Sequence, residues 1–472
     1  MRIVKLRKKV LQLAFAEAQI AVICGMMSRK SVGWRLPIPG IAILILVGLI
    51  ACEPATDAGH SSTVSDNDQA QESVSFMRGP SSMREASFWL AAEPGQEFRG
   101  RLLRNDTLEQ NFKVFIGDRG TAIHQLRNLT PGSTYECILE SFGYSRSWTF
   151  ETEENWPYRE EPPELMIALG SCNYINESAA DRPGKYGGDF GIFDKIVDID
   201  PDMMIWLGDN TYFRPPDWTS ESGIWHRRMH TRRSPSMANL LTATEHYAIW
   251  DDHDYGPNDS NGSYYGKAWA RESFDAFWPA AGPSIPGLEG TVTSFQRSDA
   301  DFFFLDNRWN RDLVRDEPVI LGRAQEDWLI RALASSQAHF KFVAVGGQFL
   351  SDAPVFENHV NLAPQERRRI LDKIAELEIT GVIFLTGDRH HSELSAQDLG
   401  DGLMVYDFTV SPLTSKPYPA KEENSNLIPE SLVEERNFGS IELRGTWSER
   451  ELEFCLYDAK GKKRFSQVIP AP

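Results

Sequence analysis

The chain has 472 residues, of which 41% are apolar and 25% are charged, an ordinary composition for a globular protein. Its formal net charge of −18 argues against a nucleic-acid-binding surface, which needs basic patches. The length predicts two domains with additional segments, and the five cysteines do not form a disulfide framework.

The amino terminus resembles a delivery signal. Residues 41–50 are apolar apart from one glycine, a run too short to span a bilayer, and basic residues precede it. The sequence Leu-Ile-Ala-Cys at 49–52 resembles a bacterial lipoprotein box, in which the Cys52 thiol would carry the lipid. We therefore predict a lipoprotein signal over residues 1–52, with a plain signal peptide as the alternative.

The signal is unusually long, so Met26 or Met27 is a candidate for the true start. Residues 53–75 are rich in Ser, Asp, Gln and Ala, which predicts a flexible tether. The protein is thus expected to be a monomer that is exported to the periplasm or cell envelope and anchored to a membrane by lipid.

Short alternating runs without a helical pattern predict a small β-domain over residues 76–152, with strands at 87–90, 112–115 and 147–150. Segment 129–135 resembles the tyrosine corner of fibronectin type III-like sandwiches, where the Tyr135 hydroxyl would bond back to the backbone. Cys137 is expected in the core of this domain. The proline-containing segment 153–163 is expected to be a linker.

From residue 164 to residue 472, apolar runs alternate with helical patterns, which indicates an α/β sandwich. Helices are expected around 190–197 and 322–338. The predicted strands are 166–169, 203–207, 247–250, 302–305, 342–345, 382–385 and 403–406, followed by the closing strands 440–443, 453–457 (burying Cys455) and 467–469, with a hairpin turn at 458–461. Sites in open α/β sheets form at the carboxyl ends of strands, and polar residues follow these strands there.

Residues able to bind a metal follow several of these strands. They are Cys172, Asp209, Tyr212, Asp252, His253, Asp388 and His390. Taken singly, a Gly-Asp pair is usually a turn, a cysteine is usually core, and a histidine near acids is usually a surface pair. Their shared position after apolar strands favours one metal centre. Segment 415–434 is either a lid over this site or a surface loop, and the loop is the simpler interpretation.

The donor types indicate the metals. Carboxylates with the Tyr212 phenolate and a thiolate suit trivalent iron, whereas Asp and Asn oxygens suit calcium, magnesium or manganese, with zinc as a further candidate. Asp209 would bridge two ions, which would clamp a phosphoryl group and activate a water or hydroxide between them. His253 would stabilise charge or protonate the leaving alkoxide, and Arg389 would add positive charge. Three neighbours would orient the ligands, namely Asp251, His391 and Glu393.

Five segments together resemble the alkaline phosphatase D (PhoD-like) family, within the calcineurin-like metallophosphoesterase superfamily. They are 170–172, 207–212, 250–254, 305–308 and 387–390, and they occur in the family's order. The resemblance implies an α/β fold built as a four-layer αββα sandwich after the small β-sandwich. It also implies hydrolysis of phosphomonoesters or phosphodiesters at an Fe³⁺ centre with calcium.

Carried onto this chain residue by residue, the resemblance assigns two groups of ligands. Cys172, Asp209, Tyr212 and Asp388 match the iron side, and Asp252, Asn258 and His390 match the neighbouring metal positions. His253 matches the histidine of the family's Asp-His-Glu-like segment, which reads Asp-His-Asp in this chain.

The expected function is therefore metal-dependent hydrolysis of phosphate esters outside the cytoplasm. One alternative is a non-catalytic cell-envelope binding lipoprotein, in which the β-domain acts and the phosphoesterase body is vestigial. A further alternative is a phosphodiesterase that acts on phospholipid or wall polymer.

Overall fold

The computed structural model describes residues 74–472. The predicted signal over 1–52, with Cys52, lies outside the described residues, as does the predicted tether apart from its last two residues. Among residues 74–472, no helix combines the length and the apolar composition that crossing a bilayer would require.

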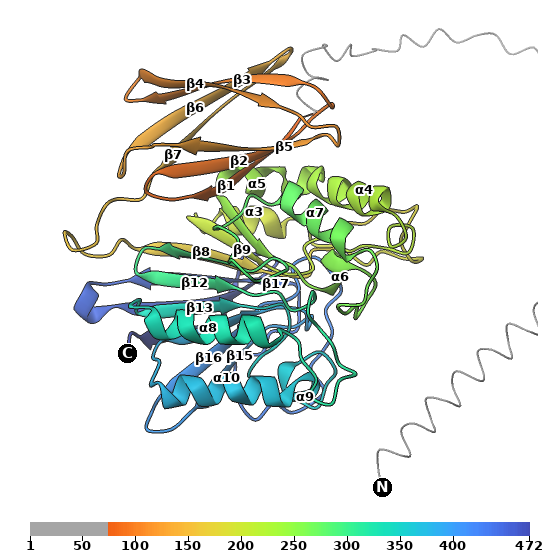
Figure 1. Ribbon diagram of the computed structural model, residues 1–472, viewed down its shortest axis with the longest axis vertical. Helices are drawn as coiled ribbons and strands as arrows, with labels where there is room; N and C mark the ends of the chain where they lie inside the picture. Colours follow the sequence, from red (N-terminus) through yellow and green to blue (C-terminus); the bar gives the residue numbers. More distant parts are fainter. Residues whose placement is uncertain (1–73) are drawn as a thin grey trace, which may run out of the picture. The chain divides into compact units, whose positions relative to one another are not determined.

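Seven strands near the start of the described chain form two antiparallel sheets that enclose their own apolar core (Figure 1). One sheet has the order β1 (Ser75–Ser81), β2 (Glu85–Ala91), β5 (Thr121–Arg127), and the other has the order β4 (Thr107–Phe115), β3 (Glu97–Arg104), β6 (Thr134–Ser141), β7 (Tyr144–Glu151). The Tyr135 hydroxyl accepts a hydrogen bond from the Thr130 amide at 2.8 Å, and Cys137 is buried. The predicted β-sandwich, its tyrosine corner and the core position of Cys137 are confirmed.

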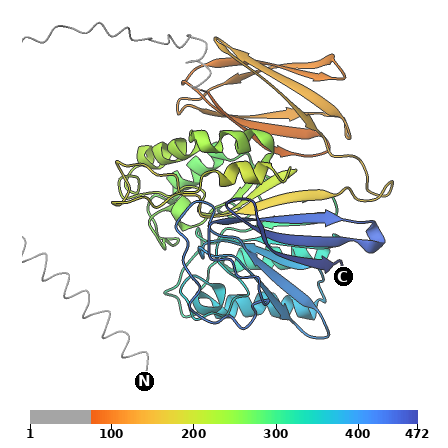
Figure 2. The same ribbon diagram turned by 180° about the vertical axis from the view of Figure 1, so that it is seen from behind.

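The rest of the chain contains two six-stranded mixed sheets. The first has the order β10 (Glu245–Ile249), β9 (Met203–Leu207), β8 (Leu165–Gly170), β17 (Asn437–Arg444), β18 (Glu451–Asp458), β19 (Lys463–Pro470). The second has the order β11 (Thr293–Arg297), β12 (Ala300–Phe304), β13 (Phe340–Ala344), β14 (Val382–Thr386), β16 (Met404–Thr409), β15 (Glu393–Asp398). Figure 2 shows blue strands from the carboxyl-terminal part of the chain extending the sheet of the yellow β8.

Helices cover the outer faces of both sheets. An apolar cluster joins the first sheet to α3 (Ile192–Val197), α4 (Glu221–Arg232), α5 (Ala238–Ala243) and α7 (Lys267–Phe277). A second cluster joins the other sheet to α8 (Arg323–Ser335) and α10 (Pro364–Glu376), which lie along one face in Figure 1. The shorter helices are α6 (Asp252–Tyr255), α9 (His359–Leu362) and the 3₁₀ turns Pro235–Met237 and Trp447–Glu449.

The main core lies between the two six-stranded sheets, where apolar side chains from both sheets pack together. Strand β9 is buried at all five positions because its sheet is covered on one face by helices and on the other by the second sheet. This arrangement explains the unbroken apolar sequence of the strand, and the predicted four-layer αββα sandwich is confirmed.

The amino-terminal sandwich shares apolar packing with the helices on the first sheet. Met77, Trp89 and Ala91 belong to the same buried cluster as α4, α5 and α7. The Trp89 indole Nε1 donates a hydrogen bond to the Ala276 carbonyl at 2.9 Å, across 187 residues of sequence. One face of the sandwich is therefore part of the hydrophobic core of the body.

Candidate metal centre

Four predicted ligands follow the carboxyl ends of four strands and converge at one edge of the sheets. Cys172 comes two residues after β8, Asp209 two residues after β9, Asp252 three residues after β10 and Asp388 two residues after β14. Strands β8, β9 and β10 pair in parallel, so their ends lie side by side. The topology thus gathers residues that are up to 216 positions apart in sequence.

The backbone of this region takes an unusual conformation. Six of its residues other than glycine have φ in the left-handed region: Cys172 (56°), Asp209 (53°), Asp259 (60°), Glu357 (79°), Asp388 (68°) and His390 (59°). Such residues are uncommon, and they tend to cluster at functional sites. Gly208 is also left-handed at 93°, and a Cβ at this position would lie 2.7 Å from the Asp251 Cβ. Only glycine fits there.

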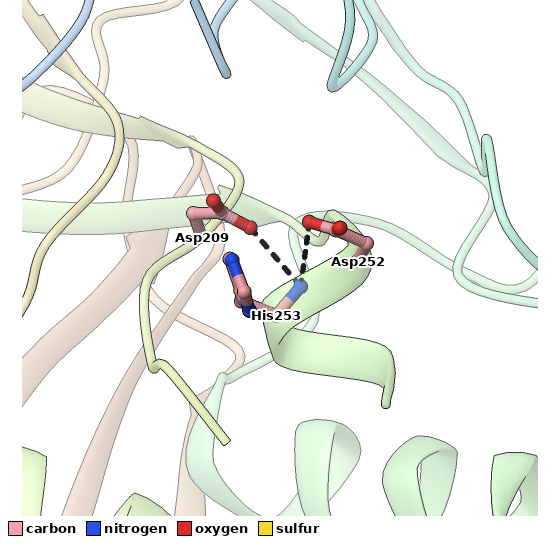
Figure 3. A group of neighbouring side chains, drawn as sticks. All are labelled: Asp209, Asp252 and His253. Atoms are coloured by element: carbon pink, nitrogen blue, oxygen red, sulfur yellow. Dashed lines mark hydrogen bonds between the residues drawn. The ribbon is translucent and has the colours of Figure 1, made fainter. Parts of the chain in front are cut away.

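Asp209, Asp252 and His253 form the first group able to hold a cation (Figure 3). Each offers one donor atom, and these atoms all lie within 4.8 Å of one another. The backbone amide of His253 donates to Asp209 Oδ1 at 3.2 Å and to Asp252 Oδ1 at 2.8 Å. The first turn of α6 therefore fixes the relative positions of the two carboxylates.

Two further groups share Asp252. One contains Asp251, Asp252 and Asp388, and the other contains Asp252, Asp259 and Glu357. The Asp259 amide donates to Asp252 Oδ2 at 2.7 Å, which ties the 258–259 loop to this carboxylate. The predicted ligand Asn258 lines the same cavity.

Sulfur, phenol and imidazole donors occupy the other side of Asp209. Cys172 Sγ lies 3.8 Å from Asp209 Oδ2 and receives a hydrogen bond from Ser411 Oγ at 3.2 Å. The Tyr212 hydroxyl lies 3.3 Å from His390 Nε2. His390 Nδ1 contacts the Lys416 carbonyl at 2.6 Å, which orients the ring so that Nε2 faces the tyrosine.

The carboxylates of the site are crowded and buried. Burial, together with repulsion from Asp252 and Cys172, holds the pKa of Asp209 well above its usual range. Burial and the charges of Asp251 and Asp252 do the same to the pKa of Asp388. A cluster of acids that resists ionisation in this way is one that a multivalent cation stabilises.

Asp252 is the exception among these acids. Burial alone would raise its pKa, but the charges of His253 and Arg308 and the amide of Asp259 outweigh burial and lower the pKa. Asp252 is thus ionised over the whole neutral range, and it belongs to all three groups able to hold a cation.

Burial raises the pKa of Cys172 to about 11, and it raises the pKa of Tyr212 well above the usual value. Both groups are therefore protonated at neutral pH unless a strong cation displaces the proton. Burial lowers the pKa of His253, and it lowers the pKa of His390 to about 4. Lowered pKa values favour the neutral form of both imidazoles, which is the form that binds metals.

The three residues expected to orient the ligands, Asp251, His391 and Glu393, each make a different set of contacts. The Asp251 carboxylate pairs with the buried Arg308 guanidinium and accepts from Asn307 Nδ2 at 2.7 Å. His391 lines the cavity, and its Nε2 lies 3.8 Å from Glu393 Oε2. Glu393 accepts a hydrogen bond from Gln348 Nε2 at 2.7 Å. These contacts hold buried charges in place beside the carboxylate groups.

Most of these donors line a cavity of about 420 Å³, namely Asp209, Tyr212, Asp252, His253, Asn258, Asp388 and His390. Cys172 is fully buried and contacts Asp209. The cavity wall also contains residues that no pattern in the sequence indicated, namely Tyr174, Arg182, Tyr186, Arg214, Glu357 and Tyr418. Tyr418 and Pro419 come from the segment 415–434, which contains no helix or strand and whose first part lies at the cavity. Glu357 precedes α9 in an irregular loop, so no strand end marks it in the sequence.

Comparisons with known proteins agree with this arrangement. The model of the PhoD-like phosphatase family matches residues 167–448. Alkaline phosphatase D of Bacillus subtilis (strain 168) is 23% identical over 281 residues, which are 49% of this chain and 46% of that protein. The chain thus aligns with less than half the length of this relative.

Two solved structures share the fold. A structure of PhoD superposes with a TM-score of 0.66 at 16% identity, covering 84% of this chain and 91% of that one. The purple acid phosphatase PPD1 of yellow lupin superposes with a TM-score of 0.60 at 12% identity, covering 84% of this chain and 74% of that one.

Proposed function

The chain belongs to the PhoD-like phosphatase family, a family of phosphoric ester hydrolases, and from this membership we propose that it hydrolyses phosphate esters with metal ions bound in the cavity. The observation that carries the proposal is the convergence of Asp209, Tyr212, Asp252 and Asp388 on one cavity from three strand ends, with Cys172 from a fourth strand end in contact with Asp209. Phosphoryl transfer needs positioning and charge stabilisation more than covalent chemistry, and a cavity of this kind supplies both.

The donor set fits two kinds of metal ion. Cys172, Asp209, Tyr212 and His390 suit trivalent iron, because thiolate and phenolate are its characteristic ligands. His390 is assigned to this group, rather than to the neighbouring position, because its Nε2 lies 3.3 Å from the Tyr212 hydroxyl.

The oxygen donors suit calcium at the neighbouring positions, with manganese, magnesium or zinc as substitutes. Asp388 is assigned to this second group because its carboxylate lies with those of Asp251 and Asp252. The remaining donors of the group are Asn258, Asp259 and Glu357. When bound, such ions supply Lewis acidity and lower the pKa of a coordinated water.

Two further residues, Arg389 and His253, are proposed to act directly on the phosphate ester. Arg389 lines the cavity with a buried Nε that has no hydrogen-bond partner among the described residues, so it is placed to bind a phosphoryl oxygen. His253 Nδ1 is likewise buried without a partner. Because its pKa is lowered, the neutral imidazole stabilises the leaving oxygen by donating an N–H hydrogen bond.

Replacement of His253 by Gln tests this role. We expect kcat for p-nitrophenyl phosphate at alkaline pH to fall by about 10²- to 10⁴-fold, the usual contribution of such a group. His226→Gln, which changes an exposed histidine on α4, is the matched control and should retain full activity. A wild-type kcat in the His253 variant would exclude the role. Absence of hydrolysis by the unmodified protein would favour the binding-lipoprotein alternative.

The iron assignment has a spectroscopic test that does not depend on turnover. Tyrosinate and thiolate bound to ferric iron give a visible charge-transfer band, so we expect the purified, metal-containing protein to be coloured. Tyr212→Phe should shift or abolish the band, whereas Tyr158→Phe, at a fully exposed position, should leave it unchanged. Metal analysis showing no iron in a colourless, active protein would refute the assignment.

The cellular setting is part of the same proposal. The signal-like sequence at 1–52 and the lipoprotein box at Cys52 support export and anchoring in the cell envelope by lipid, and we propose that the anchored protein is a monomer. We divide the chain into a signal (1–52), a tether (53–75), a β-sandwich (76–152), a linker (153–163) and a catalytic domain (164–472). Mass spectrometry of the mature amino terminus would test this division at its first boundary.

A further inference from the structure

Arg214 lies in the loop after β9, two residues beyond Tyr212, and it has no place in the metal groups described above. Its side chain lines the cavity together with His253 and Arg389, although only 7% of the residue is exposed. Its Nε is buried without a hydrogen-bond partner, and its guanidinium forms no ion pair with any of residues 74–472.

The lack of a partner follows from how the loop is built. The nearest carboxylate in sequence, Asp217, accepts a hydrogen bond from the Arg214 backbone amide at 2.7 Å. The same Asp217 oxygen pairs with Arg227 Nε at 2.9 Å, and Arg227 Nη1 pairs with Glu177 at 2.8 Å. Asp217 thus fixes the loop while its charge is neutralised by Arg227, which leaves the Arg214 guanidinium free for a ligand.

A structural role does not account for this buried charge. Within the described part of the chain, the one aromatic ring near the Arg214 guanidinium is that of Tyr174, whose centroid lies 5.9 Å from the guanidinium carbon. The stabilisation from a cation–π contact at that distance is smaller than the free-energy cost of desolvating a guanidinium group. A buried and unpaired cation in the wall of a cavity is therefore best explained by an anion that binds there.

The number of unpaired arginine side chains at the cavity indicates which class of phosphate ester the site prefers. Arg214 and Arg389 both present unpaired guanidinium groups to the cavity. At alkaline pH a phosphomonoester carries two negative charges on three non-bridging oxygens, whereas a phosphodiester carries one charge on two. With metal ions engaging part of the phosphoryl group, a diester would leave one guanidinium buried without a partner, and unpaired buried charges are strongly disfavoured.

We propose that Arg214 binds a non-bridging phosphoryl oxygen and is the residue that makes the site prefer phosphomonoester dianions over phosphodiesters. This inference rests on the proposed function. Arg389 alone then serves both ester classes, whereas the guanidinium of Arg214 discriminates between them.

The test compares two esters with the same leaving group, p-nitrophenyl phosphate and bis(p-nitrophenyl) phosphate. For Arg214→Gln we expect kcat/KM for the monoester to fall by about 10- to 100-fold, as for loss of a charge-assisted hydrogen bond, and kcat/KM for the diester to fall by less than about 3-fold. Arg214→Lys should recover part of the monoester activity. Arg331→Gln, which removes an exposed charge on α8, should change neither value.

Binding of inorganic phosphate to the metal-loaded protein, measured by calorimetry, gives a second readout. We expect the dissociation constant to rise by a similar factor of about 10 to 100 in Arg214→Gln, because phosphate presents the same non-bridging oxygens. Thermal unfolding of each variant shows that the fold is retained.

The outcomes separate the two proposals. Equal losses for both esters, an unchanged monoester rate, or unchanged phosphate affinity in Arg214→Gln would overturn the role of Arg214. Hydrolysis of neither ester by the metal-loaded wild-type protein would instead overturn the proposed function.

Discussion

Replacement of Asp209 by Asn is expected to abolish phosphate ester hydrolysis and, at the same time, to stabilise the metal-free protein. Asp209 contacts Cys172 on one side and shares a group able to hold a cation with Asp252 on the other, so it would contribute to both of the proposed metal positions. Asn keeps an oxygen that accepts the His253 amide, but it loses the negative charge that the ions require. We expect kcat to fall by at least about 10³-fold, as for loss of a central electrostatic group.

The gain in stability has the same physical origin as the loss of activity. In the metal-free protein, burial and the neighbouring acids oppose ionisation of Asp209, so a neutral side chain removes that repulsion. Urea denaturation in the presence of a chelator should therefore show a higher midpoint for Asp209→Asn than for the wild type. Asp372→Asn, on the exposed face of α10, should change neither activity nor midpoint. Turnover at the wild-type rate in Asp209→Asn would show that the metals bind elsewhere.

Removal of metal is expected to make stability fall steeply with rising pH. Asp209, Glu357 and Asp388 have pKa values raised well above the ordinary range, chiefly by burial, so the folded metal-free chain binds more protons than the unfolded chain. The free energy of unfolding then decreases as pH rises above about 4, where the unfolded carboxyls ionise, and it continues to decrease through the raised values.

Denaturation curves from pH 5 to pH 9, with chelator and with saturating metal, measure this effect. At a fixed metal concentration the ions bind more tightly as the acids lose their protons, so the two curves should diverge toward alkaline pH. The gap reaches roughly 2.7 kcal/mol where the metal concentration is about 100 times its dissociation constant. Asp254, whose pKa burial raises to about 7, is not assigned to a metal and contributes to both curves. The difference between the curves therefore isolates the metal-binding acids, and parallel curves would show that these acids do not bind the ions.

Much of this arrangement could be predicted because the fold places one kind of signal in the sequence. An apolar run such as Met203–Leu207 ends where the chain leaves the core, and the next polar side chain must lie at the sheet edge. Cys172, Asp209 and Asp388 all carry this signal, and the structure brings both aspartates within contact distance of Cys172. The fold class followed from the same runs and from the helical patterns between them.

Other members of the site carry no such signal. Glu357 lies in an irregular loop before α9, and only tertiary folding brings it to Asp252. Asp407 carries the signal of a residue at a strand end but lies inside a strand. The sequence predicts a strand that ends at residue 406, but β16 continues to Thr409 and the Asp407 carboxylate accepts hydrogen bonds from the Phe349 and Leu350 amides. Arg214 stands out only once the pairing of Asp217 with Arg227 is known.

The packing of Met77 and Trp89 into the same cluster as α4, α5 and α7 has a consequence for how this protein can change over evolutionary time. A lineage that lost the amino-terminal strands would expose an apolar patch on the layer of helices that supports the site. Such a lineage would need compensating mutations at several positions together. The two parts are therefore constrained to be inherited as a pair, and gene fusion or domain exchange is more readily tolerated before residue 75 than at the linker after residue 152.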